Sequence, residues 1–181
     1  MLLRERFCWA ILLAAAVCGC AAVASVEPLG ERPQKLSQDD WDGAWIHKDQ
    51  PITIKVTDSQ KGLLQVAWAE EKGGRFVLES YQVELREAGD WTVGNVKAKE
   101  GPAPYYWGLV KNDQGQLIIC TPDPEQFTKL VQTGVLPGKV EKGGDVVLEK
   151  LTPEHLKVIM SGERGVFFEW KKPLVFLRVG K

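Results

Sequence analysis

The chain has no excess of charge of either sign. Its 181 residues carry 23 Lys and Arg against 24 Asp and Glu, which gives a formal net charge of −1, and the two signs are interspersed along the sequence. Binding to nucleic acid requires a broad basic surface that neutralises phosphates. Because the sequence provides no such surface, we expect no nucleic-acid partner.

The sequence also lacks the motifs of common active sites. It contains no nucleophile elbow, no glycine-rich phosphate loop and no His-x-x-His or Cys-x-x-Cys metal spacing. Its two histidines, His47 and His155, lie far apart, and we interpret each as a polar residue at a strand edge. Glu70 and Glu71 stand beside Lys72, as is typical of a solvated turn. We therefore expect no enzymatic activity, no catalytic residue, no metal site and no cofactor.

An apolar run long enough to span a membrane is missing as well. The unbroken run at residues 7–17 has roughly half of the 20 residues that a membrane-spanning helix needs. It follows Arg4 and Arg6 and ends in small residues, which is the pattern of a secretory signal peptide. The sequence thus predicts export from the cytoplasm and disfavours a permanent transmembrane helix.

The end of this signal, Val17-Cys18-Gly19-Cys20, resembles the lipobox of bacterial lipoproteins. In that family an aliphatic residue, a small residue and Gly or Ala precede a cysteine. That cysteine receives a diacylglyceryl group and becomes the acylated first residue, carrying fatty acids such as palmitate. The resemblance implies a signal peptide at residues 1–19 and lipid attachment at Cys20. Since two buried acyl chains give stable anchoring, the mature protein would be held on a membrane without a spanning segment.

The residue after the lipidated cysteine bears on the destination. In the lipoprotein family an Asp at that position tends to keep the protein at the inner membrane. Ala21 stands there, so the resemblance implies an outer-membrane lipoprotein whose body faces the periplasm. The alternative is cleavage after Ala22-Val23-Ala24, an A-x-A site that would release a soluble periplasmic or secreted protein.

Cysteine is scarce in the rest of the chain. Cys8 and Cys18 belong to the signal and Cys20 is the expected lipid carrier, which leaves Cys120 alone in the folded body. An oxidising compartment permits disulfides, but one thiol cannot form an internal bridge. Because Cys120 ends an apolar run, we interpret it as a small buried hydrophobic residue.

The mature chain divides into two parts by composition. Residues 20–39 contain Pro28, Gly30 and Pro33 among polar side chains without apolar periodicity, which predicts the lipidated cysteine followed by a flexible tether. Residues 40–181 are long enough for a single domain with a substantial core.

Short segments rich in β-forming residues recur through this domain and are separated by turn residues. They lie at 52–57, 63–69, 75–85, 91–97, 105–110, 117–121, 145–151, 166–170 and 174–179. Gly73-Gly74 stands where a tight hairpin connection is expected. We predict a mostly β fold, an antiparallel meander that forms a barrel or a strongly curled sheet, with one short inserted helix.

The inserted helix begins at Asp123-Pro124-Glu125, where a capping residue, a first-turn proline and an acidic residue occur together. Phe127, Leu130 and Val131 then share one apolar face, which we expect to pack against the sheet.

Residues 156–160 have two interpretations. Thr152-Pro153-Glu154 resembles a helix start, whereas Leu156, Val158 and Met160 alternate as in a strand. We favour the strand.

Two features at the ends of the domain resemble the calycin fold of lipocalins and fatty-acid-binding proteins. In that fold a Gly-x-Trp motif opens the barrel, and a basic residue from a late strand lies over the tryptophan. Gly43-Ala44-Trp45 matches the motif, and Arg178 matches the basic residue. The resemblance implies a structural cation–π contact between Trp45 and Arg178, worth about 0.5 to 2 kcal/mol.

Two classes of function remain. The first is binding of a hydrophobic small molecule or lipid, which needs a cavity and for which Trp45, Trp68 and Tyr106 are the candidate contacts. The second is a scaffold or accessory role, in which the protein docks onto another envelope protein. A scaffold needs a filled core and an exposed apolar patch. Whether the interior of the barrel is empty or filled therefore distinguishes ligand binding from a scaffold role.

Overall fold

The structure is a computed structural model that describes residues 21–98, 103–160 and 171–180. The predicted lipid site Cys20, and the strand predicted at 166–170, lie outside these ranges. The strands are β1 Val23–Ser25, β2 Arg32–Pro33, β3 Gly43–His47, β4 Gln50–Asp58, β5 Leu63–Lys72, β6 Arg75–Ala88, β7 Trp91–Lys97, β8 Tyr105–Asp113, β9 Gln116–Cys120, β10 Gly138–Val140, β11 Val146–Leu148 and β12 Leu174–Val179. The helices in the described ranges are α2 Gln38–Trp41, α3 Pro124–Gln132 and α4 Pro153–Met160.

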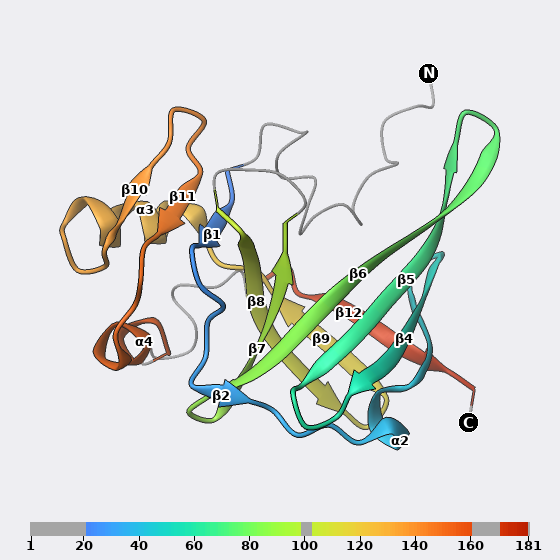
Figure 1. The fold of residues 1–181 in the computed structure, drawn as a ribbon. Coiled ribbons are helices and arrows are strands. Elements are labelled where there is room, and N and C mark those ends of the chain that lie inside the picture. The colour runs from blue at the N-terminus through green and yellow to red at the C-terminus, as the bar shows by residue number, and fades with distance from the viewer. Residues whose placement is uncertain (1–20, 99–102, 161–170, 181) are drawn as a thin grey trace.

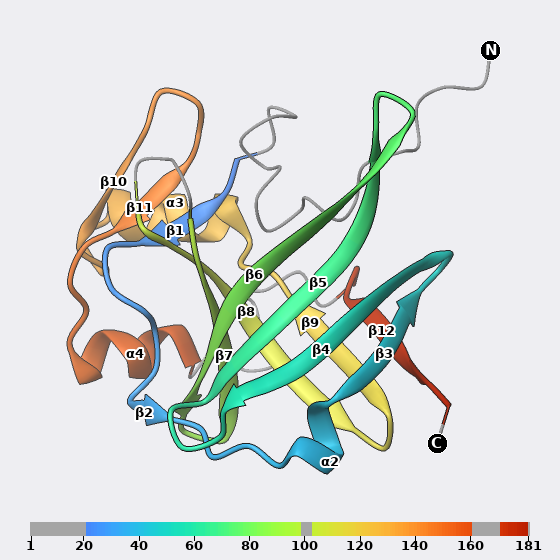
Figure 2. The same ribbon diagram turned by 45° about the vertical axis from the view of Figure 1, so that its right-hand side comes forward.

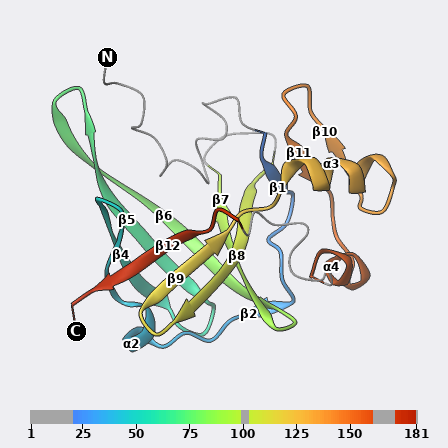
Figure 3. The same ribbon diagram turned by 180° about the vertical axis from the view of Figure 1, so that it is seen from behind.

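Eight antiparallel strands close into a barrel (Figure 1). Hydrogen-bonded neighbours follow the order β8-β7-β6-β5-β4-β3-β12-β9, and an additional pairing of β9 with β8 completes the circle. Figure 3 shows β12, β9 and β8 side by side from behind. The predicted mostly β, antiparallel barrel is therefore confirmed.

Alternation along the strands separates the inside of the barrel from the outside. On β4, Ile52, Ile54 and Val56 are buried, while Thr53 and Lys55 between them are exposed. A period of two places successive side chains on opposite faces of a sheet. The apolar set of β4 thus points into the barrel, and the polar set faces solvent.

The two longest strands, β5 and β6, form a hairpin whose tip projects beyond the barrel (Figures 1 and 2). Lys72 pairs with Arg75, so Gly73 and Gly74 are the two central residues of the turn. Their φ angles are 60° and 78°. Two successive positive φ angles define a type I′ turn, which suits the twist of a hairpin and favours glycine.

A small extension of the sheet lies beside the barrel. Strand β1 pairs in parallel with β11 and antiparallel with β8, and all three of its residues are buried. The tether predicted at residues 20–39 is wrong for this segment, because Val23 to Ser25 form part of the sheet. The backbone amide and carbonyl of Leu29 are also both hydrogen-bonded to the side chain of buried Asn95.

Helix α3 confirms the predicted inserted helix. The Asp123 carboxylate accepts hydrogen bonds from the backbone amides of Glu125 and Gln126, at 2.9 and 3.4 Å. Phe127 is fully buried and meets Trp107 of β8 edge-on, with ring centroids 5.4 Å apart. The apolar face of α3 therefore packs on the outside of the barrel, as expected.

The strand predicted at 156–160 is wrong, because these residues belong to α4. The Thr152 amide donates to Nδ1 of His155 at 3.2 Å, and the His155 amide donates to Oγ1 of Thr152 at 3.4 Å. This reciprocal pair satisfies two amides at the helix start, as in a capping box. Helical spacing also brings Leu156 and Ile159 to the core outside the barrel. In the described ranges no helix combines the length and apolarity needed to cross a bilayer.

Candidate functional site

The inside of the barrel is filled with large apolar side chains at the end covered by α2. Trp45 and Phe176, with 0% and 1% of their surfaces exposed, belong to one buried cluster there. The other buried members are Leu36, Trp41, Ile52, Ile54, Val56, Leu64, Leu85, Val110 and Leu117. This part of the barrel is a packed core and not a ligand cavity.

Arg178 and Trp45 meet as the calycin resemblance implies. They are directly paired residues of β12 and β3, and the guanidinium carbon lies 5.5 Å from the centroid of the indole ring. The guanidinium also donates to the backbone carbonyls of Asp39, at 2.7 Å, of Asp40, at 3.3 Å, and of Asp42. Arg178 thus fastens α2 to the end of the barrel.

The three candidate ligand contacts do not converge on one cavity in the described part of the chain. Trp45 lies within the packed core. Trp68 is half-buried at the edge of the same cluster and stacks on Tyr81, with ring centroids 5.4 Å apart. Tyr106 belongs to a separate small cluster with Ala24, Ala103 and Val147. Burial, and then the negative charge of Asp145, raise the pKa of the Tyr106 hydroxyl.

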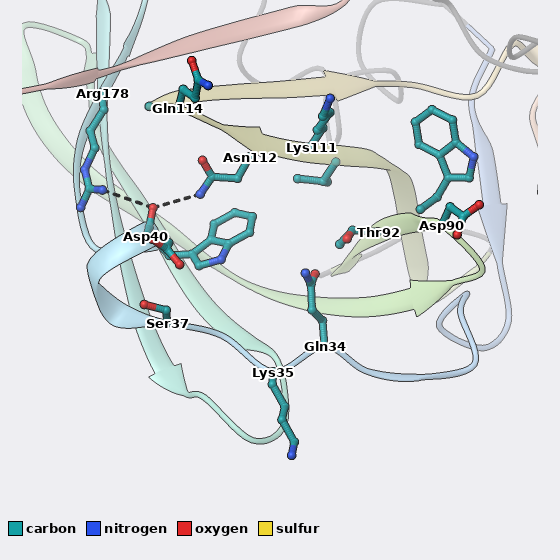
Figure 4. A pocket seen from close by; sticks show the side chains of 14 residues that line it. Gln34, Lys35, Ser37, Asp40, Asp90, Thr92, Lys111, Asn112, Gln114 and Arg178 are labelled. Carbon is teal, nitrogen blue, oxygen red and sulfur yellow. Dashed lines mark hydrogen bonds between the residues drawn. The ribbon is translucent and has the colours of Figure 1, made fainter.

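An open groove of about 710 Å³ lies at the α2 end of the molecule (Figure 4). One side is formed by residues of the segment 34–41, which crosses the end of the barrel. The other side is formed by the ends of β7 and β8 and the turns beside them. Its lining residues are Gln34, Lys35, Ser37, Asp40, Trp41, Asp90, Trp91, Thr92, Val110, Lys111, Asn112, Gln114, Gly115 and Arg178.

The groove is polar and its two sides are tied together. Ten of the fourteen lining residues are polar or charged. The amide of Asn112 and the guanidinium of Arg178 both donate to the backbone carbonyl of Asp40, at 2.9 and 3.3 Å. These are the dashed lines in Figure 4. The floor at this end of the barrel is therefore held in place before anything binds.

Gln34 is the most informative side chain of the groove. Its Oε1 is buried and accepts no hydrogen bond from the described residues. In Figure 4 the Gln34 side chain points into the space toward Thr92, whereas Lys35 points away. A buried carbonyl oxygen without a donor is costly, and a bound donor removes that cost. The groove therefore suits a ligand that provides N–H or O–H groups.

The two histidines and the cysteine singled out in the sequence lie outside the groove. Nδ1 of His47 lies 2.8 Å from the carbonyl oxygen of Val175, which accepts its hydrogen bond when Nδ1 is protonated. His155 caps α4, as described above. Cys120 is 2% exposed, and burial raises the pKa of its thiol. No group of three or more His, Cys, Asp or Glu that could hold a metal occurs among the residues that the structure describes.

The groove cannot be recognised in the sequence, because its residues come from four separated segments. Gln34 and Ser37 lie in the segment for which the composition predicts a tether. Only the closure of the barrel brings segment 34–41 against the ends of β7 and β8. Comparison of the chain with protein-family models, with curated proteins and with solved structures gives no match.

Proposed function

We propose that this protein is a non-enzymatic lipoprotein of the cell envelope that acts as a scaffold or accessory by docking onto another envelope protein. In this proposal the signal is removed before Cys20, whose acyl chains hold the protein on the outer membrane with its body facing the periplasm. The observation that carries the proposal is the packed barrel: Trp45 and Phe176 occupy the space that a carrier would offer to an acyl chain.

The position of β1 supports processing at Cys20 over cleavage after Ala24. Val23 and Ala24 are 4% and 3% exposed and pair with Val146 and Val147 of β11. A chain that began at Ser25 would lose both of these pairs. Processing at Cys20 keeps the whole of β1.

The polar groove is the docking site in this proposal. It lies at the α2 end, while the first described residues, at the start of β1, lie at the other end of the molecule (Figures 1 and 2). A lipid at Cys20 would therefore leave the groove facing away from the bilayer. Because the groove offers the buried Gln34 oxygen and several polar side chains, its occupant is an extended polar segment of the partner protein.

Binding of a hydrophobic small molecule or lipid is the second candidate. The half-buried stack of Trp68 on Tyr81 supports it, because these rings lie above the packed core on the inner face of the β5–β6 hairpin. A lipid that co-purifies with the native protein, detected by native mass spectrometry, would favour this candidate over docking.

The anchor is tested with Cys20→Ser. We expect this variant to lose acyl labelling and membrane fractionation while its circular dichroism spectrum stays that of the wild type. The intact mass of the wild-type mature protein provides the second measurement. A mature chain that begins at Ser25 and carries no acyl group would overturn the anchor and support the secreted alternative.

The docking site is tested by photo-crosslinking in cells, with a benzophenone amino acid at Thr92 in the groove or at Lys55 on the exposed face of β4. We expect one envelope protein to be crosslinked from position 92 but not from position 55. Gln34→Ala, introduced into the position-92 protein, should reduce that adduct. Adducts of equal yield from both positions would contradict docking in the groove.

A further inference from the structure

The tip of the β5–β6 hairpin exposes an apolar face. Phe76 is 81% exposed and Leu78 is 75% exposed, and the two residues lie on the same face of β6. Leu78 is paired with Ala69 of β5, which is also exposed. Phe76 is paired with the exposed Glu71, whose carboxylate borders the apolar residues on the side of the turn. Single exposed apolar residues are ordinary, but neighbouring large ones on a projecting element mark a contact surface.

The hairpin presents this face in a fixed orientation. On its opposite face, the Lys72 ammonium pairs with the carboxylates of Glu79 and Glu70, at 2.7 and 3.2 Å. Farther from the tip, Trp68 stacks on Tyr81 across the two strands. The ladder is continuous from Leu63 to the turn. Phe76 and Leu78 therefore cannot be buried by a simple folding back of the tip onto the barrel.

The chain enters the fold at the same end of the molecule as this tip. The Ala22 amide donates to the Asp145 carboxylate at 2.8 Å, and the Ala22 carbonyl accepts from the Val146 amide at 2.8 Å. Cys20 is two residues earlier in the sequence, a span of at most ~7 Å in an extended chain. Figures 1, 2 and 3 show the start of β1 and the hairpin tip at one end and α2 at the other.

We infer that the β5–β6 hairpin tip is a second membrane contact, in which Phe76 and Leu78 insert into the bilayer that receives the acyl chains of Cys20. The inference rests on the lipid anchor of the proposed function. An anchor two residues from a fixed backbone holds the body at the lipid surface, within reach of an element that projects at the same end. Arg75 lies between Phe76 and the turn and faces the other side of the hairpin with Lys72, so its long side chain can extend to the lipid phosphates while Phe76 faces the acyl chains.

Insertion is measured on the lipidated full protein in vesicles of phosphatidylethanolamine and phosphatidylglycerol. Phe76→Cys is labelled with a nitrobenzoxadiazole dye. The matched control is Gln65→Cys, which is on β5, on the same face of the hairpin as Phe76 but far from the tip. We expect the emission of the dye to shift to the blue, and to be quenched by lipids that carry a spin label in the acyl chain, when the dye is at position 76 but not when it is at position 65. A dye at position 76 that stays in water while the protein is anchored would overturn the inference.

A paired substitution tests whether the contact adds affinity. We expect the Cys20→Ser protein to bind these vesicles weakly, and Phe76→Ser with Leu78→Ser to reduce that binding about tenfold or more, because two apolar side chains leave the bilayer. The matched control is Leu177→Ser with Val179→Ser, which removes apolar residues 51% and 50% exposed on β12. Equal losses in both pairs would overturn the inference.

The outcomes separate the two proposals. Failure of the wild-type protein to acquire acyl chains contradicts the anchor. An acylated, vesicle-bound protein whose position 76 stays in water contradicts the hairpin contact alone. A dye at position 76 that is protected from water in cells but not on vesicles would show that the tip contacts a protein partner. That result would also overturn the bilayer contact.

Discussion

Replacement of Arg178 by alanine tests how the α2 end of the barrel is held. The substitution removes donors to three backbone carbonyls, of Asp39, Asp40 and Asp42, and the cation over Trp45. A hydrogen bond from a charged donor contributes about 1.5 to 3 kcal/mol, and a cation–π contact about 0.5 to 2 kcal/mol. Because Arg178 is partly exposed and one of its bonds is long, we expect a total loss of about 3 kcal/mol.

Urea unfolding of the Cys20→Ser protein, followed by tryptophan fluorescence, measures this loss as a change in the free energy of unfolding. For a domain of this size, about 3 kcal/mol corresponds to a melting temperature about 6 to 12 °C lower. Arg178→Lys should lose about half as much, since one ammonium cannot reproduce the planar set of donors.

The matched control is Lys111→Ala, which removes a cation from β8. The Lys111 ammonium lies 3.4 Å from the Asp113 carboxylate, and both side chains are more than half exposed. Exposed ion pairs contribute between 0 and about 1 kcal/mol, so we expect less than about 0.5 kcal/mol. A loss of less than about 1 kcal/mol in Arg178→Ala, or one equal to that of the control, would refute the role assigned to Arg178.

Two further predictions concern buried polar groups. Asn95 is 1% exposed and bonds both backbone groups of Leu29, so Asn95→Ala should lower the free energy of unfolding by about 2 to 4 kcal/mol and accelerate hydrogen exchange at the Leu29 amide. Unchanged exchange there would contradict this assignment. Burial raises the pKa of the Cys120 thiol. Native Cys20→Ser protein that lacks residues 1–19, and with them Cys8 and Cys18, should therefore not react with a disulfide reagent at pH 8, whereas the same protein unfolded in urea should react completely. Fast reaction of the native protein would show that Cys120 is accessible.

The parts of the fold that the sequence predicts are those whose signals are local. The alternation of apolar and polar residues on β4 can be read from the sequence because one face of that strand is exposed to solvent. Gly73-Gly74 identifies a hairpin because its turn needs two positive φ angles. The start of α3 is visible because Asp123, Pro124 and Glu125 each suit a helix N-terminus. The antiparallel barrel follows from many such strands in succession.

The parts that the sequence does not predict depend on distant partners. β1 has only three residues, and its partner β11 is more than 100 residues away, so Val23 to Ser25 show no periodicity of their own. In α4, Leu156, Val158 and Met160 alternate by chance. The capping role of His155 replaces the usual Glu or Gln. The groove was not predicted for the same reason, since its residues come from four distant segments and Arg178 is the one that a sequence resemblance singled out.

The place of β12 in the barrel has a consequence for how the protein is made. The last of the described strands lies between β3 and β9, two strands formed much earlier in synthesis. Until residues 174–179 arrive, both neighbours expose unpaired edges, which are templates for aggregation. A stop codon that deletes this short strand would leave an open sheet with two unpaired edges that is prone to aggregation. The growing chain therefore needs protection until residues 174–179 can pair with β3 and β9.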